Sequence, residues 1–141
     1  MLRFKKCQDD AVIPTKAGPN EIGFDLTITS VVKEVNSNTK MYDTGIAVEP
    51  SGGIYIEIAP RSSLSKTGYI LTNSIGIIDP TYRGTLKVVL TKISSDAPEL
   101  ELPCNKFQLI PRMIVDVQVN VADDLSETER GSGGFGSTDK R

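Results

Sequence analysis

The sequence predicts an all-β domain, because short runs of alternating apolar and polar residues recur along it and turn signals separate them. Residues 54–58 and 115–121 alternate most regularly. This period of two is typical of strands that have one face on a core. Clusters of Gly, Pro, Asn and Ser stand between the runs, and no long helical period competes with them. Many short strands separated by turns favour an antiparallel sandwich or barrel.

Four runs are expected to form strands, and they cover residues 24–28, 54–58, 86–90 and 115–121. In each run every second residue is Phe, Leu, Ile or Val, so one face of the strand is apolar. The chain has 141 residues, 38% of them hydrophobic and none of them Trp. That length suits one domain with an aliphatic core.

A short helix and a polar tail complete the expected organisation. Residues 62–67 are expected to form the helix, with Ser62 or Ser63 as its N-cap. The β-domain is expected to occupy residues 1–122, and residues 123–141 form a polar, Gly-rich C-terminal arm. Most such tails are solvated ends, but the single Phe and the Arg here favour a mobile segment that closes over a ligand.

Charge and composition exclude several classes of protein. Sixteen basic residues oppose eighteen acidic ones, so no global field recruits nucleic acid. The absence of His, with Cys7 and Cys104 far apart, argues against a zinc site and excludes Ser-His or Cys-His catalysis. Neither a secretory h-region nor an apolar run of transmembrane length is present. An intracellular protein, in the cytoplasm or nucleus and with no membrane partner, is therefore expected.

Two polar constellations are candidates for chemistry. Arg61, Ser62 and Ser63 follow the run at residues 54–58, where an arginine and two hydroxyls suit an anion. Ordinary helix N-caps look similar. Asp79 ends an apolar run and precedes a proline. It is either a turn-initiating residue or a partly desolvated general base.

Four further residues have both a structural and a functional interpretation. The Asn73 amide can donate to and accept from the edge of a base, and Tyr82 can pack against a sugar. A lone Gln such as Gln108 in an apolar strand usually bonds to backbone. Asp25 lies opposite an apolar strand face, where a solvent-facing residue is the ordinary interpretation.

The Gly-rich tail has the physical features of a phosphate-binding segment. Gly131 and Gly136 have the spacing of the glycines in the P-loop, but Ser137 stands where its Lys belongs, so the P-loop interpretation fails. Glycines still let backbone N–H groups approach phosphate closely, and Arg130 can form a fork onto its oxygens. Phe135 offers a flat face for stacking on a base.

Taken in order, five segments resemble the five motifs of the trimeric dUTPase family. They are Gly23-Phe24-Asp25-Leu26, Pro60-Arg61-Ser62-Ser63-Leu64, the stretch from Gly76 to Gly84 that contains Asp79 and Tyr82, Gln108-Leu109-Ile110, and Arg130-Gly131-Ser132-Gly133-Gly134-Phe135-Gly136-Ser137-Thr138. The third and fifth are the most specific. In the second, Ser63 stands where Gly is usual. The resemblance spans residues 11–138.

The resemblance implies a jelly-roll-like subunit, a homotrimer with shared active sites, and hydrolysis of dUTP to dUMP and pyrophosphate with Mg²⁺. Such an enzyme limits uracil in DNA and supplies dUMP for dTTP synthesis. Asp79 would be the base that activates water. The implied substrate-binding residues are Arg61, Ser62, Ser63, Asn73, Gly76, Tyr82, Gln108, Arg130, Phe135, Gly136, Ser137 and Thr138, with Asp25 in support. No protein group would ligate Mg²⁺ directly, since the triphosphate and waters would hold it.

Two alternatives belong to other functional classes. A dCTP deaminase has a similar fold, but it would use a Glu for its base chemistry and lack the Gly-rich string of the tail. A non-catalytic dUTPase-like binding or signalling module would lose either Asp79 or the arm, and both are present.

Overall fold

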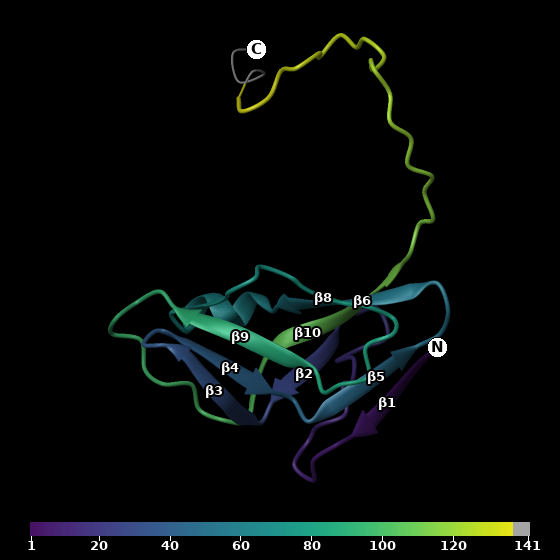
Figure 1. Ribbon diagram of the computed structural model, residues 1–141. Helices are drawn as coiled ribbons and strands as arrows, with labels where there is room; N and C mark the ends of the chain where they lie inside the picture. The colour runs from purple at the N-terminus through teal and green to yellow at the C-terminus, as the bar shows by residue number, and fades with distance from the viewer. Residues whose placement is uncertain (137–141) are drawn as a thin grey trace.

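The computed structural model describes residues 1–136 as two packed antiparallel sheets, a separate antiparallel pair of strands and an extended C-terminal arm (Figure 1). The strands are β1 (Leu2–Lys6), β2 (Phe24–Ile28), β3 (Ser30–Asn36), β4 (Thr39–Asp43), β5 (Ile46–Pro50), β6 (Ile54–Pro60), β7 (Tyr69–Leu71), β8 (Gly76–Ile78), β9 (Lys87–Lys92) and β10 (Cys104–Met113). A short 3-10 helix, η1 (Ser62–Lys66), joins β6 to β7.

The two larger sheets have the strand orders β2-β10-β6-β8 and β3-β4-β9-β7, and β1 pairs with β5. Every pairing is antiparallel, and most neighbours in space are distant in sequence. The long strand β10 lies between β2 and β6, so the end of the β-domain is central to its first sheet. This arrangement is the jelly-roll sandwich, which confirms the expected fold class.

The core lies between the two large sheets. Leu26, Ile56 and Phe107 from the first sheet are fully buried, as are Leu86 and Leu90 beside the second. Within each strand the buried residues occupy every second position, so the period of two identifies the face of the strand that the core covers. Three of the four expected strands are therefore confirmed, as β2, β6 and β9.

The expected strand at residues 115–121 is wrong for the single chain. Strand β10 ends at Met113, and the valines of the following stretch are exposed, with Val119 at 88% and Val121 at 100%. Figure 1 shows this segment leaving the body of the molecule. An alternating pattern specifies an apolar face but not the neighbour that covers it, and within residues 1–136 no strand pairs with this segment.

The expected N-cap of the short helix is also wrong. Arg61, in an extended conformation, occupies the N-cap position, and no side chain caps η1. The hydroxyl of Ser65 instead donates to the carbonyl oxygen of Ser62 at 2.6 Å. The helix is held by Leu64, whose side chain is buried in the core.

The cysteines and the helical content of the chain complete the fold. Both cysteines are free thiols, with Cys7 exposed and Cys104 buried. In the part of the chain that is described, no helix has the length and hydrophobicity needed to span a bilayer. The boundary of the arm at residue 122 stays a prediction.

Candidate functional site

Strands β2, β10 and β6 bring three of the sequence motifs side by side. Gln108 on β10 pairs with Asp25 on one side and with Ala59 on the other. Its neighbours Phe107 and Leu109 are fully buried, so Gln108 lies on the opposite face of the sheet, away from the core. Its amide Nε2 donates to the carbonyl oxygen of Pro60 at 3.2 Å.

Arg61 and Asp25 form an ion pair across this face. Nη1 of Arg61 lies 3.0 Å from Oδ2 of Asp25, and it also donates to the carbonyl oxygen of Asn105 at 3.2 Å. Both side chains remain about one-third exposed, at 36% and 31%. The guanidinium is thus oriented but still accessible, and five donors on one fork leave some free for an anion. The ordinary interpretation of Asp25 was a free solvent-facing carboxylate, but the residue is paired with Arg61.

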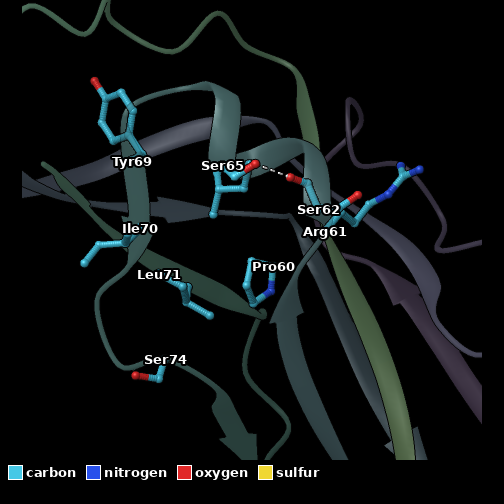
Figure 2. A pocket seen from close by; sticks show the side chains of 9 residues that line it. Pro60, Arg61, Ser62, Ser65, Tyr69, Ile70, Leu71 and Ser74 are labelled. Atoms are coloured by element: carbon cyan, nitrogen blue, oxygen red, sulfur yellow. Dashed lines mark hydrogen bonds between the residues drawn. The ribbon is translucent and has the colours of Figure 1, made fainter. Parts of the chain in front are cut away.

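A pocket of about 460 Å³ opens beside this ion pair. Its walls come from the end of β6, from η1, from β7 and from the turn that follows, and Figure 2 shows their side chains. The lining residues are Pro60, Arg61, Ser62, Leu64, Ser65, Tyr69, Ile70, Leu71 and Ser74. The pocket therefore joins the second motif to the turn before β8. Ser63 is half-buried on η1 and does not line it.

A tight turn from β7 in one sheet to β8 in the other carries Asn73. Ser74 adopts a positive φ of 63° there, and the N–H of Ile75 donates to the carbonyl oxygen of Asn73 at 2.7 Å. Gly76 pairs with Ile58 on β6. A Cβ on Gly76 would lie 3.8 Å from Nδ2 of Asn73, so the exposed Asn73 amide lies over the backbone of Gly76.

Asp79 starts the turn after β8, and its carbonyl oxygen accepts the N–H of Tyr82 at 3.0 Å. Asp79 is exposed, so residues 1–136 of one chain leave the carboxylate in contact with solvent. Arg83 closes the turn from within: its Nη1 donates to the carbonyl oxygens of Pro80 at 2.6 Å and Tyr82 at 2.9 Å. The same guanidinium contacts Glu49 of β5 at 3.4 Å.

Tyr82 folds back over the end of this loop. Its hydroxyl donates to the carbonyl oxygen of Thr85 at 3.1 Å, and its side chain is 41% exposed. A Cβ on Gly84 would lie 2.6 Å from Cζ of Tyr82. The ring therefore rests directly on the Gly84 backbone and presents its other face to solvent. Glu49 had no role in the sequence-based interpretation, because its contact with Arg83 joins segments that are far apart in the chain.

The described part of the arm, which ends at residue 136, extends away from these residues in the single chain (Figure 1). The Nε of Arg130 donates to the carbonyl oxygen of Gly133 at 2.9 Å, within the arm itself. Phe135 is fully exposed, and Gly136 has a positive φ of 88°. Ser137 and Thr138 lie outside the described residues.

Electrostatics at the neighbouring end of the sheet are set by Glu57. Nε of Arg112 donates to its Oε2 at 2.9 Å, and the hydroxyl of Tyr55 donates to its Oε1 at 2.8 Å. These two bonds hold the pKa of the Glu57 carboxyl below its ordinary value and raise the pKa of Arg112 and of Tyr55. Within residues 1–136, no cluster of His, Cys, Asp or Glu could cage a metal ion.

The jelly-roll sandwich, with arginine and amide donors on one face and a Gly-rich arm beyond it, defines a protein built to hold a phosphate-bearing ligand. A family model described as dUTPase matches residues 9–139, and the chain belongs to the dUTPase family. It is 37% identical to the deoxyuridine 5'-triphosphate nucleotidohydrolase of Nautilia profundicola, over 99% of each chain. Identity to the Clostridioides difficile protein of that name is 36%, over 97% of this chain and 96% of that one.

Solved structures show the same fold at lower identity. A mutant dUTPase of Staphylococcus bacteriophage 80alpha, solved with dUpNHpp, superposes with a TM-score of 0.82 at 20% identity, covering 98% of each chain. The dUTPase from phage phi11 of S. aureus gives a TM-score of 0.75 at 16% identity, covering 91% of this chain and 99% of that one.

Proposed function

We propose that the chain hydrolyses dUTP to dUMP and pyrophosphate. Membership of the dUTPase family supports this, since relatives that match almost end to end are deoxyuridine 5'-triphosphate nucleotidohydrolases. The observation that carries it is the convergence of Asp25 and Gln108, on adjoining strands, with Arg61 at the end of β6. An accessible guanidinium and an amide on one face are suited to phosphate oxygens.

Asp79 is the proposed general base. Its carboxylate would accept a proton from a water molecule, which would attack the α-phosphorus in line with the leaving pyrophosphate. Arg61, Gln108 and the hydroxyls of Ser62 and Ser63 would hold the phosphates and offset the charge that develops on their oxygens. Asp25 would hold Arg61 in orientation, as their 3.0 Å ion pair suggests.

The base and sugar would be read by the loops on either side of β8. The Asn73 amide and the backbone at Gly76 would bond to the edge of uracil, because an amide both donates and accepts. Tyr82 would pack under deoxyribose and leave no room for a 2'-hydroxyl. Once a bound base covers these polar groups, a base with a different donor pattern would leave them unpaired, which is costly.

The exposure of Asp79 favours a shared site in a homotrimer. Closure of an active site expels bulk water and strengthens the electrostatic interactions inside it, whereas residues 1–136 of one chain leave this carboxylate exposed. We infer that neighbouring subunits and the arm complete the enclosure. Arg130, Ser137 and Thr138 would clamp the triphosphate, Phe135 would lie over the base, and Gly136 would let the backbone approach closely.

Magnesium is the proposed cofactor. The donor set fits an ion held by the substrate, because the described residues offer no carboxylate cage and Mg²⁺ keeps several waters. A structural Mg(II) ion is known for the phage phi11 dUTPase, which shares the fold with a TM-score of 0.73 at 15% identity. When bound, the ion would neutralise charge on the triphosphate.

Pyrophosphate release from dUTP, dTTP, dCTP and UTP, measured with and without Mg²⁺, tests the proposal. We expect release from dUTP alone among the four, and a strong dependence on the ion. Ammonia released from dCTP would identify a deaminase instead. Tight binding of dUTP without pyrophosphate would identify a non-catalytic binding module.

A further inference from the structure

Asp43 is a buried carboxylate at the end of β4, only 7% exposed, and the reaction proposed above does not use it. Two hydrogen-bond donors and one ammonium group surround it. Oδ1 accepts the N–H of Gly45 at 2.8 Å, Oδ2 accepts the hydroxyl of Thr85 at 2.8 Å, and Nζ of Lys87 lies 3.6 Å from Oδ2. A buried carboxylate is costly unless such partners compensate it, so its position here calls for a role.

The partners of Asp43 connect it to the loop that carries Tyr82. Lys87 also donates to both oxygens of Thr85, at 2.8 Å to the hydroxyl and 3.3 Å to the carbonyl. That carbonyl oxygen is the acceptor for the Tyr82 hydroxyl. Asp43 and Lys87 therefore fix Thr85 through its side chain, and Thr85 in turn fixes the outer end of the tyrosine ring.

The ring has few other restraints. It is 41% exposed and rests on Gly84, which has no side chain to hold it. Its hydroxyl makes one hydrogen bond among the described residues, to Thr85. If that acceptor shifts, the ring is free to tilt about its Cβ, and the space that it leaves for a sugar changes.

We propose that Asp43 is a positioning residue for sugar selection, acting through Thr85 and Lys87 on the Tyr82 ring. The inference rests on the proposed role of Tyr82 against deoxyribose. It adds that the discrimination between dUTP and UTP depends on a buried carboxylate on another strand. The alternative explanation is that the backbone alone fixes the position of Thr85. Both the N–H and the carbonyl oxygen of the next residue, Leu86, form hydrogen bonds with the turn at residues 44–46.

The experiment compares kcat/KM for dUTP with kcat/KM for UTP in Thr85→Val, Thr85→Ser and Tyr82→Phe. We expect Thr85→Val and Tyr82→Phe each to lower the ratio by about threefold to tenfold, the value of one hydrogen bond. Thr85→Ser keeps the hydroxyl and should restore the ratio. The double variant Thr85→Val with Tyr82→Phe should have the same ratio as each single variant, because both changes break the same connection.

Glu99→Gln is the matched control. Glu99 accepts from Lys40 and Lys92, which belong to the same two strands as Asp43 and Lys87 but lie at their other ends. We expect this variant to keep the wild-type ratio. Should Thr85→Val fail to fold, Asp43→Asn replaces it, with the same fall in the ratio expected.

Three results would overturn the proposal. The first is an unchanged ratio in Thr85→Val. The second is an equal loss for both nucleotides, which indicates a purely structural role. The third is a double variant whose effects multiply. A wild-type chain that leaves dUTP intact would instead refute the proposed function itself, so the two failures are distinguishable.

Discussion

The backbone of Gly23 packs directly against the side chain of Gln108, across the pairing of β2 with β10. A Cβ added at Gly23 would lie 2.9 Å from Cβ of Gln108, closer than real Cβ contacts. Gly23 itself is half-buried and directly precedes β2. The glycine of the first motif thus determines where the glutamine of the fourth can stand.

Gly23→Ala should therefore weaken substrate binding. The added methyl group would displace Gln108 from its place beside Pro60, and the KM for dUTP should rise by about tenfold, roughly the value of one hydrogen bond to a charged group. Steady-state kinetics measure this. Gly52→Ala is the control, since a Cβ there meets nothing within 4 Å. An unchanged KM in Gly23→Ala would show that Gln108 has no phosphate role.

Asp25→Asn should loosen Arg61. The guanidinium would lose its charged partner but keep the carbonyl oxygen of Asn105, so we expect the KM for dUTP to rise by about threefold to tenfold while the fold persists. Glu57→Gln, which removes the partner of Arg112 on the same sheet, serves as the control with an unchanged KM. Equal effects of the two variants would argue against a specific role for Asp25.

Asp79→Asn should abolish turnover but retain binding. The amide has nearly the shape of the carboxylate but cannot accept the proton, so kcat should fall by about 10²- to 10⁴-fold. Binding of dUpNHpp, measured by calorimetry, should stay within a few-fold of the wild-type value. Near-normal turnover would remove Asp79 from its proposed role.

Deletion of residues 130–141 should separate catalysis from folding. The described part of the arm is exposed and adds little to the core, so the melting temperature should hardly change. Catalysis should collapse, because the clamp on the triphosphate is lost. Circular dichroism and pyrophosphate release provide the two measurements. A fully active truncated chain would show that the arm is only a solvated end.

Stability in acid should depend on Glu57. Its folded-state pKa lies below the ordinary 4.5 because Arg112 and Tyr55 donate to it, so the unfolded chain binds the proton more readily. The stabilisation is therefore complete above pH 4.5 and is lost as the pH falls through the lower folded-state value. Urea midpoints across this range should fall less steeply in Glu57→Gln. Parallel curves for the two proteins would contradict the assignment.

The sequence predicted the strands whose partners lie inside the chain. Residues 24–28, 54–58 and 86–90 alternate because one face of each meets a core, and that relation is local to each strand. Residues 115–121 have the same alternation but no partner strand in the described chain. Periodicity measures the apolar face and carries no information about what will cover it.

The candidate site was predictable in its residue types but not in its contacts. The pairing of Arg61 with Asp25 joins segments that are far apart in the chain, and nothing in either motif specifies it. Asp43 gave no signal, because a single carboxylate at the end of a strand resembles any turn residue. Its burial, its two hydrogen-bond donors and its ion pair with Lys87 emerge only when β4, β5 and β9 assemble.

The different environments of the two thiols give a direct assay of the folded fraction. A maleimide dye would react with Cys7 in the native chain, whereas Cys104 is shielded by the sandwich. Unfolding opens the second position, so the stoichiometry of labelling should rise from one to two dyes per chain. Counting attached dye by mass spectrometry would then report the integrity of any variant before its kinetics are interpreted.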